Sequence, residues 1–317
     1  MRPKMNMLVV TAIDESHRLE AHGLIRSVQR ILAPMLVFNL GGIPAARLAE
    51  LRSACGVRVR TFQWQRWAPS LDALGPQRRL YGCGWKPTVI RLALEAAGPG
   101  RAVLWADASV RLTDLAAVEL ASAATFGVAA RYTVGTVREY TSPAMVTRWE
   151  AHGRGNGTAL GRAPSRASRV APRAPSSSAV AATAVGPLIT RALNARMLAA
   201  TILLWPGERG GAAVEALRRW ERCCLDPACF APSGARGQPC PGCHRYDQSA
   251  LNLALHTAGM ASQAQRASAH IAAATRTVRG AKGSAKLRNT TCPRLWATGS
   301  GTGLPRSSFA LRSTTHH

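Results

Sequence analysis

The first 130 residues alternate between short apolar runs and segments whose apolar positions recur every three or four residues. The apolar runs predict buried strands, and the longer spacing predicts helices that pack on them. The expected strands are 8–14, 35–42, 57–63, 102–112 and 126–132, and the expected helices are 16–33, 44–54, 86–97 and 113–124. Strands that alternate with helices favour an α/β fold with a mixed, mainly parallel sheet flanked by helices.

The pattern changes after residue 150. Residues 151–195 are rich in Gly, Pro, Ser, Ala and Arg and contain no acid, so we predict a disordered basic insert. A folded pattern resumes with a strand at 197–207 and helices at 212–225 and 246–258, and residues 259–317 again predict a disordered basic tail. The expected organisation is therefore one split domain, formed by residues 1–150 and 196–258.

The net charge of +25, from 41 Lys and Arg against 16 Asp and Glu, raises the possibility of a nucleic-acid partner. Residues 151–193 and 244–317 hold sixteen of these basic residues, with Asp247 as their one acid. Solvated basic segments explain most of the charge, so we expect no specific nucleic-acid partner. A basic protein that binds nucleic acid or other anions remains an alternative function.

The chain contains no apolar run of eighteen residues, which predicts that no segment spans a membrane. The N-terminal sequence has one short apolar run and lacks the pattern of a signal peptide. We interpret it as a strand and expect no targeting signal.

The strongest candidate for chemistry is Asp107, which follows the apolar run 102–106 and precedes Ala108 and Ser109. Open α/β sheets place ligand groups at the carboxyl ends of their strands. A carboxylate with a nearby hydroxyl is able to hold Mg²⁺ or Mn²⁺, which in turn neutralises a diphosphate. Alternatively, Asp107 only caps the turn that follows the strand.

A second candidate is the glycine-rich segment that ends in Trp85, Lys86 and Pro87, directly before a predicted helix. Its glycines allow close backbone approach, and Lys86 adds positive charge at a helix start, which suits a diphosphate. Trp85 offers a ring on which a base or sugar can stack. The alternative is a tight turn with Pro87 in the first helical turn.

A third candidate is the segment 243–252, where His244 and Asp247 lie about one helical turn apart. We predict that Asp247 acts as a base on an acceptor hydroxyl or holds the sugar. The alternative is that Asp247 is simply a favourable acid in a first helical turn.

Five of the eight cysteines fall between residues 223 and 243. They are compatible with disulfides, with a structural zinc site or with free thiols, and disulfides suit an oxidising compartment best. A zinc-stabilised interaction module is therefore a further alternative function.

Five short segments, in a consistent order, resemble an uncharacterised eukaryotic family related to GT-A nucleotide-diphospho-sugar transferases. They are Gly84–Pro87 (the WKP motif), Val103–Ser109 (Asp-Ala-Ser), Tyr140–Met145 (T-S-P-x-M), Cys224–Pro232 and His244–Asn252 (HRYDQSALN). The resemblance covers about residues 6–150 and 197–258.

This resemblance implies a GT-A-like, Rossmann-like fold and a UDP-sugar donor, in the Golgi or another part of the secretory pathway. It implies Asp107 and Ser109 at the diphosphate and at a Mn²⁺ or Mg²⁺ ion, Lys86 near phosphate, and Asp247 with Gln248 facing the sugar or acceptor. The expected activity is metal-assisted transfer of a sugar to a hydroxyl of a glycan or protein. A catalytically inactive relative is the remaining alternative.

Overall fold

The structure is a computed structural model that describes residues 6–76, 79–80, 83–154, 179–207, 211–232 and 245–278, with only the backbone of residues 154 and 179–185. The strands are β1 (Met7–Ile13), β2 (Met35–Asn39), β3 (Val57–Thr61), β4 (Ala102–Ala106), β5 (Val110–Leu112), β6 (Ala129–Thr136), β7 (Arg196–Trp205) and β8 (Thr275–Thr277).

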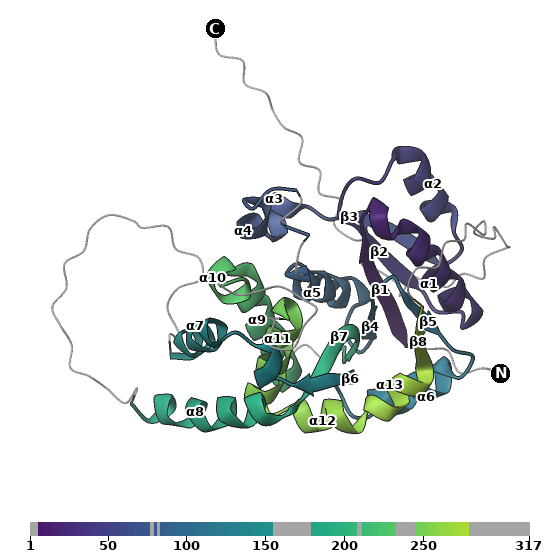
Figure 1. The fold of residues 1–317 in the computed structure, drawn as a ribbon. Helices are drawn as coiled ribbons and strands as arrows, with labels where there is room; N and C mark the ends of the chain where they lie inside the picture. The colour runs from purple at the N-terminus through teal and green to yellow at the C-terminus, as the bar shows by residue number, and fades with distance from the viewer. Residues whose placement is uncertain are drawn as a thin grey trace, which may run out of the picture.

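The helices lie between and after these strands (Figure 1). The first half of the chain contributes η1 (Glu15–His17), α1 (Arg18–Arg30), α2 (Ala45–Ser53), α3 (Trp64–Trp67), α4 (Pro69–Asp72), α5 (Lys86–Ala97), α6 (Ala116–Ala124), η3 (Arg138–Tyr140) and α7 (Pro143–Arg154). The second half contributes α8 (Ala179–Asn194), α9 (Gly211–Leu225), α10 (Pro227–Phe230), α11 (Tyr246–Thr257), α12 (Ala261–Arg266) and α13 (Ser268–Ala274).

The main sheet of the described chain has six strands in the order β3-β2-β1-β4-β7-β6. The strands β3, β2, β1 and β4 run parallel, whereas β7 is antiparallel to both β4 and β6. Helices cover the sheet on both faces (Figure 1). These findings confirm the predicted mixed, mainly parallel sheet flanked by helices.

The period-two alternation of the strands divides the core between the two faces of the sheet. In β1, Leu8 and Val10 point to a face covered by α5, α9 and α11. Met7 and Val9 point to the opposite face, which is covered by α1, α6 and α13. Both faces of the central strands are therefore buried, which explains why six of the seven residues of β1 are apolar, with Thr11 as the exception.

The predicted strand 102–112, expected to run into a polar turn at Asp107, is two strands that this turn separates. The chain leaves the sheet after Ala106, turns through Asp107, and forms β5, which pairs with β8 in a separate two-stranded sheet. The turn closes with a hydrogen bond of 2.9 Å from the Val110 amide to the Asp107 carbonyl. The turn at Asp107 agrees with the sequence, whereas the separate strand β5 after it was not predicted.

The predicted disorder is wrong for part of the chain. Residues 179–194 of the expected insert form α8, and residues 261–277 of the expected tail form α12, α13 and β8. The tail helices bury Ile271 and Ala274 against the core beneath α1 and α6. Small alanine side chains make these helices look featureless in the sequence, yet they pack closely. Residues 151–154 of the expected insert also belong to α7, and residues 155–178 and 279–317 lie outside the described residues.

Gly207 allows the strand β7 to pair closely with β4. A Cβ at this position would lie 2.4 Å from the backbone nitrogen and oxygen of Arg101. The Gly207 carbonyl accepts a hydrogen bond of 3.0 Å from the Gly100 amide. No other residue fits this backbone-to-backbone contact without a shift of the chain.

We expect the substitution Ile271→Ala to lower the free energy of unfolding by about 2–5 kcal/mol, because Ile271 is fully buried. Val118 of α6 is 66% exposed and serves as a matched control, with an expected change for Val118→Ala within about 0.5 kcal/mol. Urea denaturation of both variants measures the difference. Equal stability of the two variants would contradict the packing of α13.

Candidate functional site

A cavity of about 380 Å³ lies at the carboxyl ends of β1 and β4. The two strands are parallel neighbours, with Val10 opposite Trp105, so the residues that follow them meet at one edge of the sheet. Asp14 follows β1 and Asp107 follows β4, and both line the cavity. The structure thus places Asp107 where the sequence predicted a ligand group.

Asp107 is anchored through one of its two carboxylate oxygens. Its Oδ1 accepts a hydrogen bond of 2.9 Å from Nε1 of Trp105 and lies 3.2 Å from Nζ of Lys86. The side chain is 30% exposed and faces the cavity, which Ser109 also lines. Oδ2 has no hydrogen bond or ion pair with the part of the chain that is described.

Lys86 is the first residue of α5, and its side chain is only 4% exposed. Its ammonium lies 3.2 Å from Asp107, 3.1 Å from Oδ2 of Asp247 and 3.0 Å from the carbonyl of Ala200. Burial alone would lower the pKa of Lys86, but the charges of the two carboxylates raise it well above its usual range. The lysine is therefore charged at neutral pH.

These contacts modify the predicted role of Lys86. An ammonium has three N–H donors, and three protein oxygens surround this one. Lys86 therefore stabilises Asp107 and Asp247 directly, and its contribution to a phosphate in the cavity is its charge.

Asp247 lies in the first turn of α11, on the other side of this ammonium. Burial raises its pKa to about 6, although Lys86 acts in the opposite direction. Three hydrogen bonds fix the helix that carries it: Nε1 of Trp220 donates to the Asp247 carbonyl at 2.8 Å, and the Asn252 side-chain amide pairs with the backbone of Leu198 at 2.8 and 2.9 Å. The carboxylate is thus held firmly beside Lys86.

Trp85 lies in the wall of the cavity, whereas Gln248 does not. Trp85 lines it, but its ring is only 6% exposed and packs edge-on against Trp105 with centroids 5.8 Å apart. Little of the predicted stacking surface is therefore open, whereas its buried Nε1 has no hydrogen-bond partner. Gln248 and Asp247 are not among the residues that line the cavity.

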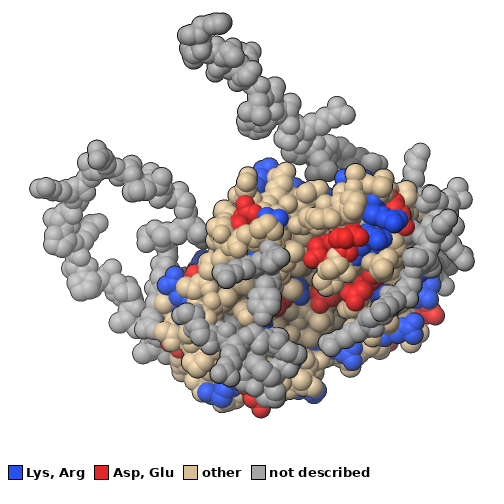
Figure 2. Space-filling view, turned by 45° about the horizontal axis from the view of Figure 1, so that its top comes forward, with Lys and Arg blue, Asp and Glu red and all other residues tan. Residues whose placement is uncertain are grey.

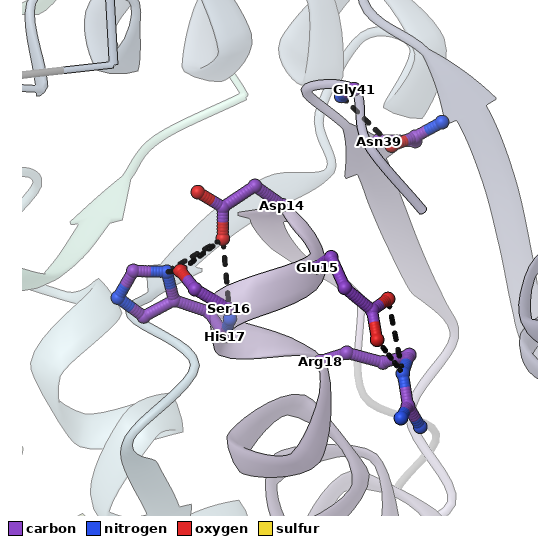
Figure 3. A network of polar contacts seen from close by, with 7 residues as sticks. All are labelled: Asp14, Glu15, Ser16, His17, Arg18, Asn39 and Gly41. Atoms are coloured by element: carbon purple, nitrogen blue, oxygen red, sulfur yellow. Dashed lines mark hydrogen bonds and ion pairs between the residues drawn. The ribbon is translucent and has the colours of Figure 1, made fainter. Parts of the chain in front are cut away.

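The sequence reasoning missed a polar network around Asp14, shown in Figure 3. Oδ1 of Asp14 accepts hydrogen bonds from the Ser16 hydroxyl at 2.6 Å and from the His17 amide at 3.2 Å, and Nδ1 of His17 lies 2.8 Å away. Burial opposes ionisation, but these bonds outweigh it and lower the pKa of Asp14. The available signal was the position of Asp14 at a strand end, the same feature that identified Asp107.

The cavity has an acidic lining. Asp14, Glu20 and Asp107 contribute carboxylates, and His17 is the basic side chain among the lining residues. Figure 2 shows Asp and Glu side chains gathered in the middle of the face, next to Lys and Arg. Because a diphosphate would be repelled by three carboxylates, its entry requires a compensating cation.

The oxygen atoms near Asp107 suit a divalent cation that enters the cavity bound to a diphosphate. No group of three or more His, Cys, Asp or Glu side chains is arranged as a metal site within the described ranges. Mg²⁺ commonly binds through one or two carboxylates together with substrate phosphates and water. For such an ion, Oδ2 of Asp107 and the Ser109 hydroxyl would be the protein's contribution.

The cysteine-rich segment contains a disulfide between Cys223 and Cys229, at the junction of α9 and α10. Cys224 is a buried free thiol. Two of the sulfurs considered for zinc are thus bonded to each other, which disfavours the predicted zinc alternative. Cys240, Cys243 and His244 lie outside the described residues.

We expect Lys86→Met to lower the free energy of unfolding by about 3–5 kcal/mol, because it leaves two carboxylates next to each other without their cation. Arg47 is a suitable control, since its ion pair with Glu50 is exposed and the expected cost of Arg47→Met is at most about 1 kcal/mol. Denaturant titrations compare the two variants. A Lys86→Met protein as stable as the control would show that the buried triad does not stabilise the fold.

No protein-family model matches the sequence, and comparison with curated protein sequences finds no match. Solved structures give weak similarity to several glycosyltransferases. The bifunctional glycosyltransferase WbbM is 13% identical, with a TM-score of 0.39 over 78% of this chain and 37% of its own. This chain therefore spans well under half the length of WbbM.

Two further similar structures cover more of their own chains. Core-mannan synthase A of Aspergillus fumigatus, in a Mn/GDP form, is 8% identical, with a TM-score of 0.44 over 80% of this chain and 70% of its own. Mouse xyloside xylosyltransferase 1 is 10% identical, with a TM-score of 0.37 over 78% of this chain and 80% of its own. With TM-scores below 0.5, these similarities identify neither a donor nor an acceptor for the present chain.

Proposed function

We propose that this protein is a glycosyltransferase that moves a sugar from a UDP-sugar to a hydroxyl group of a glycan or protein. The observation that carries the proposal is the convergence of Asp107 and Asp247 on Lys86 beside a cavity at the strand ends. In this proposal, Asp107 faces the cavity and serves the leaving diphosphate, whereas Asp247 on the adjacent helix serves the acceptor.

The donor would lie along the cavity, with its diphosphate beside Asp107 and Ser109. The polar network of Asp14 and His17 at the end of β1 would hold the nucleoside. A divalent cation bound through Oδ2 of Asp107 would offset the charge of the departing diphosphate. The strand ends would also hold the donor and the acceptor in a fixed orientation, which would account for much of the remaining increase in the rate of sugar transfer.

Asp247 is the proposed base for the acceptor hydroxyl. Its raised pKa of about 6 leaves it ionised at neutral pH while making it a better proton acceptor than an ordinary aspartate. Lys86 keeps this carboxylate in place, since its ammonium lies 3.1 Å from Oδ2. Gln248, the next residue, remains our candidate for a contact to the sugar.

The disulfide between Cys223 and Cys229 supports a location in the secretory pathway, such as the Golgi lumen, because disulfides persist in oxidising compartments. Among the described helices, none is long and apolar enough to cross a membrane.

We expect UDP and Mn²⁺ together to stabilise the protein against heat, and either one alone to have little effect, because Asp107 supplies only part of a metal site. At a ligand concentration about 100-fold above Kd, the stabilisation is about 2.7 kcal/mol. Thermal-shift measurements with UDP, and with GDP for comparison, test this expectation.

The substitution Asp107→Asn should abolish that shift, whereas Asp114→Asn, which changes an exposed acid outside the cavity lining, should preserve it. Absence of any nucleotide-induced shift in the unmodified protein would favour a catalytically inactive relative. A shift that survives Asp107→Asn would place the cation elsewhere.

We expect the rate of UDP release from the best-binding nucleotide sugar to rise as the pH increases through about 6, because Asp247 must lose its proton to accept one. Asp247→Asn should lower the rate by roughly 10²–10⁴-fold and remove this rise. Measured pH–rate profiles test both statements.

His17 also lines the cavity, and its imidazole is a second group able to accept a proton. His17→Gln is therefore the control: the rise near pH 6 should persist in this variant. Loss of the rise in His17→Gln, with an unchanged profile for Asp247→Asn, would assign the base to the histidine.

A further inference from the structure

Arg245 immediately precedes α11 and is held in a fixed position on the Asp247 side of the site. Its amide donates to the Tyr140 carbonyl at 2.9 Å, and Nη1 donates to the Thr133 hydroxyl at 3.1 Å. Its guanidinium carbon lies 4.0 Å from the centroid of the Tyr140 ring. An arginine fixed in this way loses little conformational entropy when it binds a ligand.

The Nε of this guanidinium has no hydrogen-bond partner among the described residues. No carboxylate of the described chain lies within ion-pair distance of Arg245, and its Nε is buried without a hydrogen bond. A buried donor without an acceptor costs about 1–3 kcal/mol, so an incoming oxygen atom is favoured there. A carboxylate that reached this side of the guanidinium would pair with the parallel N–H groups of Nε and Nη2.

The surroundings of Arg245 also favour an anion. Nε2 of Gln248, one turn further along α11, is a second buried donor without a partner. Arg196 donates from Nε to the Thr133 carbonyl at 3.4 Å, with its guanidinium carbon 4.6 Å from the Tyr132 ring, so a second positive charge lies at the same strand end. This part of the site is thus rich in donors, in contrast to the acidic cavity.

We propose that the acceptor carries a carboxylate and that Arg245 binds it side-on, which rests on the function proposed above. Arg245 lies two residues before Asp247, so a bound carboxylate would set the distance from the acceptor to the base. The acceptor would be a uronic or other acidic sugar of a glycan, or a hydroxyl next to an acidic side chain of a protein.

The test compares methyl β-glucuronide with methyl β-glucoside, which differ at one carboxylate, by saturation-transfer NMR titration with and without UDP and Mn²⁺. We expect the glucuronide to bind about tenfold or more tightly to the unmodified protein. Arg245→Gln should remove this preference, and Arg245→Lys should retain only part of it, because lysine keeps the charge without the paired donors. An acetylated glutamate amide distinguishes a peptide carboxylate from that of a sugar.

Arg131→Gln, an equal change of charge at an exposed position of β6, is the matched control and should leave the preference intact. Equal binding of the two glycosides to the unmodified protein would overturn the inference, as would a preference that Arg245→Gln leaves unchanged. Since UDP binding is followed in the same samples, failure of nucleotide binding is seen separately from failure of carboxylate recognition.

Discussion

The buried ammonium of Lys86 is the interaction on which the rest of this structure depends. It joins the start of α5, the end of β4 and the start of α11, three segments that are far apart in the sequence. A lysine that is almost completely buried is stable only with opposite charge around it, and each carboxylate in turn needs the lysine. The fold and the site therefore depend on each other. If Asp107 or Asp247 moved away from Lys86, a charged group would be left buried without its partner.

The antiparallel strand β7 is what brings α11 to this site. The chain leaves the sheet after β6, passes through α7 and α8, and returns as β7 between β4 and β6. Because β7 contributes the Ala200 carbonyl to Lys86 and pairs through Leu198 with Asn252, the return of the chain positions both the ammonium and the helix that carries Asp247. The entropic cost of closing a loop grows only slowly with its length, so the long connection before β7 is compatible with a well-defined site.

The sequence allowed much of this to be predicted, and the limits have physical causes. Apolar runs identified the central strands because those strands are buried on both faces, and the position of Asp107 at a strand end identified it as a cavity residue. The partners of Lys86 could not be predicted from the sequence, because ion pairs between distant segments leave no local sequence pattern. The helices α12 and α13 were missed because alanine-rich surfaces pack well while giving a weak periodic signal.

The close passage of β7 past the turn before β4 also bears on how relatives of this chain can be found. Gly207 leaves no room for a side chain next to Arg101, so a relative whose backbone follows the same course at this point needs glycine there. A glycine two residues after an aromatic strand end, at Trp205, is thus a marker of topology and not of catalysis. A relative that keeps this backbone course would need the glycine even if it had lost both acids.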